Sequence, residues 1–236
     1  MLENLILELR EHASPERAQS SLRYFKTGKG EYGEGDKFLG ITVPIQRKIA
    51  KKYYKTLTLQ DVEKLLDNQF HELRLTGLII LSEMYKKSKK ERLTQRRIFE
   101  FYLKKINRIN NWDLVDISAP AIIGDFVMKS GEDILMQLAK SKNMWERRIA
   151  IISTFAMISK RKFGETLALS NYLLHDKQDL IHKAVGWALR EVGKKNPETL
   201  RIFLSTRYKE MPRTMLRYAI EKLPEEERKQ WLKGLM

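Results

Sequence analysis

Residues 74–81 have the sequence Arg-Leu-Thr-Gly-Leu-Ile-Ile-Leu, in which a base is followed three residues later by glycine and then by an apolar run. Two other segments have the same order, with alanine or glycine as the small residue. Residues 147–152 are Arg-Arg-Ile-Ala-Ile-Ile, and residues 183–189 are Lys-Ala-Val-Gly-Trp-Ala-Leu. The small residue would let a neighbouring helix approach closely. No segment of the chain alternates polar and apolar residues as a half-buried strand would, so the pattern predicts helices.

The three segments also indicate a repeat. They begin at residues 74, 147 and 183, so they are 73 and 36 residues apart, and 73 is about twice 36. The missing copy would begin near residue 110, where Asn-Asn-Trp-Asp opens a helix without the base. Periods of about 35–45 residues with two helices each are typical of HEAT-type α-solenoids. We therefore expect an all-α fold, a curved α-solenoid of HEAT-like repeats whose bases line a basic concave face. Coincidence among Lys- and Arg-rich helices is the alternative.

Helix starts are marked along the chain. Ser14-Pro15 and Asn196-Pro197 each combine an N-cap residue with proline at the first helical position. Three further prolines, Pro44, Pro212 and Pro224, stand where other helices could begin. The one loop-like stretch, residues 28–37, contains the pattern G-x-G-x-x-G. In a dinucleotide-binding fold this pattern follows a strand. Here a helix precedes it, and we interpret the stretch as a flexible connection.

Charge narrows the choice of partner. The 236 residues include 45 Lys and Arg against 30 Asp and Glu, a formal net charge of +15 spread over the whole chain. This excess favours a polyanion, and nucleic acid before a membrane surface, as the partner. Cysteine is absent, which excludes disulfides and thiol chemistry. No apolar run approaches the roughly 20 residues that span a bilayer. We expect one domain over residues 1–236 and a cytoplasmic protein.

The tryptophans suggest where the chemistry lies. Trp112, Trp145 and Trp187 occur near the starts of helices in successive repeats. Two acids follow the first of them. Asp113 would lie in the first turn of its helix, where capping and the helix dipole explain a carboxylate. Asp116 lies a turn further on and has no such explanation. No nearby His or third acid completes a metal site, so we expect no metal.

Five segments together resemble the AlkD family of DNA alkylation-repair glycosylases, which is built of HEAT-like repeats. They are residues 22–26 (Leu-Arg-Tyr-Phe-Lys), 38–41 (Phe-Leu-Gly-Ile), 110–116 (Asn-Asn-Trp-Asp-Leu-Val-Asp), 143–150 (Asn-Met-Trp-Glu-Arg-Arg-Ile-Ala) and 183–191 (Lys-Ala-Val-Gly-Trp-Ala-Leu-Arg-Glu). The likeness covers nearly the whole chain. The combination of motifs is specific, whereas no single motif is decisive.

The resemblance implies a monofunctional DNA glycosylase. It would hydrolyse the N-glycosidic bond of positively charged alkylated purines, such as 7-methylguanine and 3-methyladenine, in duplex DNA. Trp112, Asp116 and Trp187 match the family's active-site aromatic residues and acid, Arg148 matches its active-site arginine, and Tyr24 matches a tyrosine beside the DNA. The resemblance also implies attack from the sugar-phosphate side without base flipping, no metal or organic cofactor, and a monomer.

These residue types suit the reaction. A cationic purine is already a good leaving group, so positive character on the deoxyribose is what the enzyme has to stabilise. Indole faces and a carboxylate can do this, and the carboxylate can also orient water. Lys183 and Arg190 would provide a track for DNA phosphates. The chain departs from some relatives at Asn111, where they have a second Trp, and in its longer Gly-rich loop, which could alter how the N-terminal helices clasp DNA.

Two other functions are alternatives. A non-catalytic HEAT-like module would bind DNA by charge and shape, and we would expect it to lack the active-site residues. A protein scaffold would need a large exposed apolar groove and would not need a charge of +15. The joint presence of Trp112, Asp116, Arg148 and Trp187 favours the enzyme.

Overall fold

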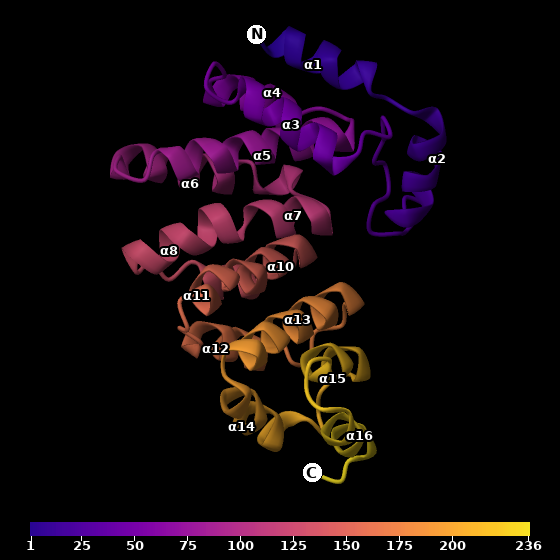
Figure 1. Cartoon of the computed structure of the whole chain (residues 1–236), viewed down its shortest axis with the longest axis vertical. Coiled ribbons are helices and arrows are strands. Elements are labelled where there is room, and N and C mark those ends of the chain that lie inside the picture. The colour runs from indigo at the N-terminus through magenta and orange to yellow at the C-terminus, as the bar shows by residue number, and fades with distance from the viewer. The chain divides into compact units, whose positions relative to one another are not determined.

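A computed structural model describes all residues from 1 to 236. The chain is helical from end to end (Figure 1), and its β-structure is limited to an isolated bridge between Lys37 and Phe70. The predicted all-α fold is confirmed. The chain forms two compact units, Met1–Ile122 and Ile123–Met236. The single domain expected over residues 1–236 stays a prediction. No helix is both long enough and apolar enough to cross a membrane.

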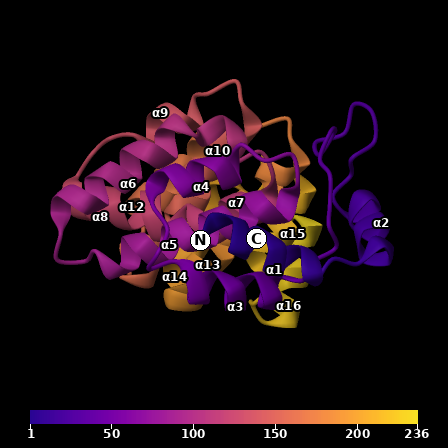
Figure 2. The ribbon, with the colours of Figure 1, turned by 90° about the horizontal axis from the view of Figure 1, so that it is seen from above.

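The first unit is arranged around its longest helix, α5 (His71–Lys87). Every residue from His71 to Ser82 is buried, because α5 packs against α3, α4, α6 and α7. In contrast, α2 (Pro15–Tyr24) buries none of its residues and stands apart from α1 and α3 (Figure 2). The other helices of this unit are α1 (Leu2–Glu11), α3 (Val43–Tyr53), α4 (Leu59–Leu66), α6 (Arg92–Lys104), the 3-10 turn η1 (Ile106–Arg108) and α7 (Trp112–Ser118).

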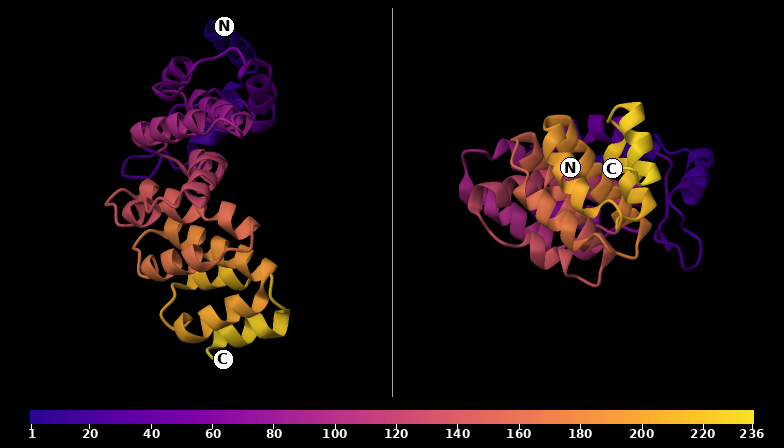
Figure 3. Two further views of the ribbon diagram at one scale, coloured as in Figure 1. Left: turned by 90° about the vertical axis from the view of Figure 1, so that its left-hand side faces the viewer. Right: turned by 90° about the horizontal axis from the view of Figure 1, so that it is seen from below.

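The second unit begins within η2 (Pro120–Gly124), a π-helical turn, and its helices lie in successive rows (Figure 3). Its central helix is α13 (Asp179–Lys195), which packs against α10 (Met144–Ser153), α11 (Phe155–Ser159), α12 (Gly164–Tyr172), α14 (Pro197–Arg207) and α15 (Arg213–Ile220). The unit also contains α8 (Asp125–Ser130), α9 (Leu135–Ala139) and α16 (Glu225–Lys233).

The helix starts lie where the sequence predicts them. The side chain of Ser14 accepts a hydrogen bond from the amide of Arg17 at the start of α2, and that of Asn196 accepts one from Thr199 at the start of α14. The three other prolines, Pro44, Pro212 and Pro224, lie at the starts of α3, α15 and α16. These starts are predictable because a cap is formed by residues adjacent in sequence.

The small residue of each repeated segment has the expected role. Ala150 is completely buried. A Cβ atom at Gly77 would lie 3.1 Å from the Cβ of Leu65 on α4. At Gly186 a Cβ atom would lie 2.5 Å from the carbonyl oxygen of Met215, so α13 and α15 can approach this closely only with glycine there.

The base of the repeated segment does not have its expected role. Arg74 is buried, and its Nη1 donates to the carbonyls of Asn68 and Gln69, six and five residues earlier. Arg147 makes the same two contacts with residues 141 and 142. Each guanidinium also binds a carboxylate, that of Asp36 or of Asp176. The prediction that these two arginines line an exposed basic face is therefore wrong. They satisfy carbonyls of the loop that precedes their own helix.

The tight contact at Gly186 predicts a specific loss of stability. Gly186→Ala should lower the free energy of unfolding by about 1–3 kcal/mol, because the methyl group would overpack the contact with Met215 and Tyr218. Urea unfolding measures this. Gly164→Ala is the matched control, since a Cβ atom there meets open space. Equal stability of the two variants would contradict the close approach of α13 and α15.

Candidate active site

Trp112 and Asp116 share one face of α7. Asn111 caps this helix, with its side-chain oxygen accepting a hydrogen bond of 2.8 Å from the amide of Trp112. Residues four apart on a helix are neighbours, so the carboxylate of Asp116 follows the indole by one turn. Both side chains are half-buried. The helix therefore presents a large aromatic ring and an acid together at the surface of the first unit.

Asp116 also lies near a buried phenol. Burial raises the pKa of Tyr102 far above its usual value, a hydrogen bond of 3.0 Å with Ser118 opposes this change, and the negative charge of Asp116 adds to it. Tyr102 therefore stays a neutral hydroxyl beside α7.

A cluster of rings surrounds Trp112. The ring of Phe25 stacks on the indole at 5.3 Å with an interplanar angle of 17°. Phe25 also packs against Phe38 and against the imidazole of His71, at 5.0 and 4.9 Å. The ring of Tyr24 meets the indole edge-on at 5.8 Å and is 66% exposed. The structure thus brings Tyr24 together with Trp112, as expected if both face the same ligand.

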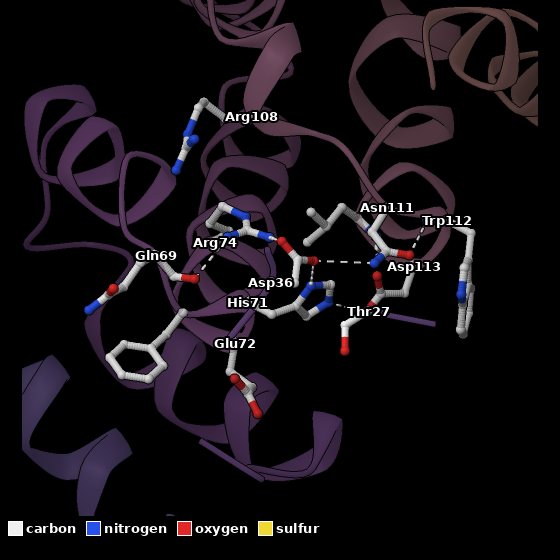
Figure 4. Close-up of polar contacts among 12 residues, drawn as sticks. Thr27, Asp36, Gln69, His71, Glu72, Arg74, Arg108, Asn111, Trp112 and Asp113 are labelled. Carbon is white, nitrogen blue, oxygen red and sulfur yellow. Dashed lines mark hydrogen bonds and ion pairs between the residues drawn. The ribbon is translucent and has the colours of Figure 1, made fainter. Parts of the chain in front are cut away.

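Behind this ring cluster lies a buried polar cluster (Figure 4). His71 is 1% exposed, and its ring lies between two carboxylates. The Nε2 atom is 2.7 Å from Asp113 and the Nδ1 atom is 3.2 Å from Asp36. The carboxylate of Asp36 also accepts a hydrogen bond of 2.6 Å from Nη2 of Arg74 and one of 3.3 Å from the side-chain Nδ2 of Asn111. We call these five residues the His71 cluster.

The ionisation of the His71 cluster follows from its contacts. Burial by itself would lower the pKa of His71, but the hydrogen bonds to Asp113 and Asp36 outweigh burial and raise this pKa to about 9. Burial would likewise raise the pKa of Asp36, yet the hydrogen bond to His71 and the charge of Arg74 hold this pKa below its usual value. At neutral pH the imidazole is therefore a cation and Asp36 an anion.

The next residue, Glu72, connects this cluster to α2. Its buried carboxylate accepts hydrogen bonds from the backbone amides of residues 39, 40 and 41. This segment in turn holds the start of α2, since the amide of Ser14 donates to the carbonyl of Leu39 and the Nε of Arg17 donates to that of Gly40. Gly40 has φ +76°, and a Cβ atom there would lie 2.1 Å from the carbonyl oxygen of Ser14. The start of α5 therefore positions the helix that carries Tyr24.

Two interpretations of the sequence need correction. The loop of residues 28–37 is more than a flexible connection, because it brings Asp36 into the His71 cluster. Asp113 is not explained by capping alone, because it also binds His71. The missed signal was the segment His71-Glu72-Leu73-Arg74, which places three polar residues shortly before the apolar run of residues 78–81. Polar groups at the start of so deeply buried a helix need partners elsewhere in the chain.

The other predicted site residues lie in the second unit. Trp187 is half-buried on α13, where its ring meets Phe155 edge-on at 4.6 Å and its Nε1 donates to Glu191 at 3.3 Å. Arg148 on α10 is only 5% exposed, and its Nη1 donates to the carbonyl of Leu180 at 2.7 Å. Arg148 thus ties α10 to the first turn of α13.

The two bases predicted for a phosphate track already have acidic partners. Lys183 pairs with Asp179 at 2.8 Å, one turn earlier on α13. Arg190 pairs with Glu221 and Glu191. Binding to DNA would require each base to exchange or share its carboxylate. As for a metal, no group of three His, Asp or Glu side chains is arranged to hold an ion.

Comparison with known proteins identifies the family of the chain. A family model described as DNA alkylation repair enzyme matches residues 5–223. The chain belongs to this family. Membership gives the protein a role in DNA alkylation repair, with DNA as its partner. No protein with a curated description matches the chain significantly.

Solved structures of the family share the fold. A predicted DNA alkylation repair enzyme from Enterococcus faecalis has a TM-score of 0.69 and 20% identity, covering 91% of this chain and 98% of the other. AlkD2 from Streptococcus mutans has a TM-score of 0.57 and 19% identity, covering 90% and 100%. The fold is thus that of the AlkD-type helical-repeat proteins. Within it, Asn111 both caps α7 and binds Asp36.

The His71 cluster predicts how stability depends on pH. The pKa of His71 is about 9 in the folded state, against about 6.5 in an unfolded chain. The folded state therefore binds more protons between these values, and stability should fall as pH rises from about 6.5 to 9, by on the order of 3 kcal/mol. Urea unfolding across this range measures the slope.

Two variants test the assignment. His71→Gln should be less stable at neutral pH and should lose the slope, because no imidazolium forms. His175→Gln is the control, since His175 is exposed beside Glu210, and it should keep the slope. An equally steep slope in His71→Gln would show that another group causes it.

Proposed function

We propose that this protein is a monofunctional DNA glycosylase that acts, as a monomer, on positively charged alkylated purines such as 7-methylguanine and 3-methyladenine in duplex DNA. The observation that carries the proposal is the pairing of Trp112 with Asp116 on one half-buried face of α7, next to the exposed ring of Tyr24. Asp113, the other acid of α7, is engaged by His71. Asp116, which lies one turn after Trp112 on the same face of α7, is the carboxylate that we assign to the reaction.

The reaction is a hydrolysis at C1′ of the deoxyribose. The bond between C1′ and the purine nitrogen breaks, and its electron pair neutralises the cationic base as it leaves. Water supplies the new C1′–O bond, and its proton passes to Asp116 and then to solvent. The charge of Asp116 stabilises the cationic sugar in the transition state, and the Trp112 and Trp187 rings contribute by cation–π attraction.

Attack from the sugar-phosphate side would leave the lesion in the base stack. In support, the hollow beside Tyr24 is an open groove lined by Arg17, Ser20, Ser21 and residues 40–42. An open groove suits contact with a DNA backbone better than it suits the enclosure of a flipped base. Arg148, which is 5% exposed, would contact a phosphate near the lesion.

The assignment of Asp116 is tested by base release. Asp116→Asn should lower the release of 7-methylguanine from duplex DNA by about 10²-fold or more, because it removes a preorganised charge, while the Kd for DNA changes little. Chromatography of the released base under single-turnover conditions, without added metal, measures the rate.

The matched control is Asp133→Asn, which removes the same charge from an exposed loop position and should release base like the wild type. Full activity of Asp116→Asn would refute its role. A wild type that binds duplex DNA but releases neither 7-methylguanine nor 3-methyladenine would indicate the non-catalytic module.

The phosphate contact of Arg148 has its own test. Arg148→Ala should weaken binding across DNA sequences and reduce the slope of log K against log salt concentration by about 0.9, the value for one phosphate. Arg201→Ala removes an equal charge from a guanidinium held by Glu227 and should leave the slope unchanged. Circular dichroism checks that the variant is folded, since Arg148 also binds Leu180. An unchanged slope in folded Arg148→Ala would exclude the contact.

A further inference from the structure

We propose that His71 is a positioning residue for Trp112: as a buried imidazolium bound to both Asp36 and Asp113, it fixes the first turn of α7 and thereby the indole. The positioning is a property of the first unit alone. Its meaning for catalysis rests on the proposed glycosylase function, whereas its structural effect can be measured without DNA.

The geometry requires both ring nitrogens of His71 to donate. The carboxylates of Asp36 and Asp113 lie 3.2 and 2.7 Å from Nδ1 and Nε2, and an ionised carboxylate only accepts hydrogen bonds. A neutral imidazole has one N–H and so could serve only one of the two acids. The other acid would remain buried beside an acceptor, which is unfavourable. Loss of the proton therefore removes the His71 bridge between the loop of residues 28–37 and α7, and only the hydrogen bond from the side-chain amide of Asn111 to Asp36 still joins them.

The contacts of His71 lead to Trp112 by two routes. Through the backbone, Asp113 directly follows Trp112 in the first turn of α7, and its second oxygen, Oδ1, accepts from the amide of Leu114. Through the side chains, the ring of Phe25 packs against both the imidazole and the indole, at 4.9 and 5.3 Å. An imidazole held in place therefore fixes the backbone that carries Trp112, and through Phe25 it also fixes one face of the indole.

The charged groups around His71 come from the loop of residues 28–37, from α7 and from α5. Asp36 comes from the loop, Asp113 comes from α7, and Arg74 and Glu72 come from α5 itself. Glu72 is turned to the amides of residues 39–41, so the cluster proper holds two carboxylates and two cations. It is neutral overall while His71 is protonated. In agreement, these contacts raise the pKa of His71 to about 9, so the bridge is intact at neutral pH.

One substitution separates the charge of His71 from its contacts. In Asp113→Asn, the side-chain amide can donate to Nε2 of a neutral imidazole, while Nδ1–H still donates to Asp36. The bridge then no longer needs the second proton and should survive at high pH. In His71→Gln, by contrast, no imidazolium bridges Asp36 and Asp113 at any pH. His175→Gln controls for the loss of a histidine at an exposed site.

The test uses fluorine NMR of the full chain labelled with 5-fluorotryptophan. The Trp112 resonance is identified by its absence in Trp112→Phe, and the resonances of the three other tryptophans are internal references. In the wild type, the Trp112 signal should move and broaden as pH rises through about 9. In Asp113→Asn it should stay sharp over this range, and in His71→Gln it should be broad already at pH 7. A sharp, pH-independent Trp112 signal in both wild type and His71→Gln would overturn the proposal.

A second experiment measures whether this positioning affects the rate of base release. At pH 7 His71→Gln should excise 7-methylguanine about 10²-fold more slowly than the wild type, with a similar Kd for DNA, because a displaced group costs rate more than binding. At pH 9.5 Asp113→Asn should retain a larger share of its pH 7 rate than the wild type does. Excision by His71→Gln at the wild-type rate would show that the positioning of Trp112 by His71 does not contribute to catalysis. If the wild type excises no base, the proposed function fails, and the NMR result still decides the positioning.

Discussion

One protonated imidazole held between two carboxylates is the interaction on which the first unit depends. The ring of His71 joins three segments that are distant in sequence: the end of the Gly-rich loop at Asp36, the start of α5 and the first turn of α7 at Asp113. Buried charges of this kind are stable only when each has a partner, because the free-energy cost of removing an unpaired ion from water is not offset by any interaction in the protein. Arg74 and Asn111 complete the set by binding Asp36.

The same need for partners explains the repeated arginines. Helices that stack closely leave the carbonyls of the preceding loop away from water, and a guanidinium with several donors can serve two of them and a carboxylate at once. Arg74 and Arg147 do this with identical spacing, six and five residues back. A basic residue in a helical repeat is therefore not in itself evidence of a nucleic-acid surface.

Local features of the fold could be predicted from the sequence, and distant ones could not. Ser14, Asn111 and Asn196 cap helices because the groups they bind lie within three residues. Gly186 was identifiable as a contact because a small residue before an apolar run suits close helix packing. The His71 cluster escaped prediction because Asp36 lies 35 residues before His71 and 75 before Asn111, and no local pattern encodes such a pairing. At the candidate site, α7 brings Trp112 and Asp116 together by its own periodicity.

The attachment of α2 has a consequence for local stability. This helix buries none of its residues, and polar contacts to the carbonyls of residues 39 and 40 hold its start. Segments with few buried apolar contacts open at a smaller free-energy cost than the core does. Tyr24, at the end of α2, thus belongs to a helix whose start is held by polar contacts and whose end is held by the ring of Phe25 in the ring cluster. Trp112, against which it packs, is anchored to that core. The two rings that face one another are therefore carried by helices that differ in their buried packing, since α2 buries none of its residues whereas α7 buries Leu114, Val115 and Ser118.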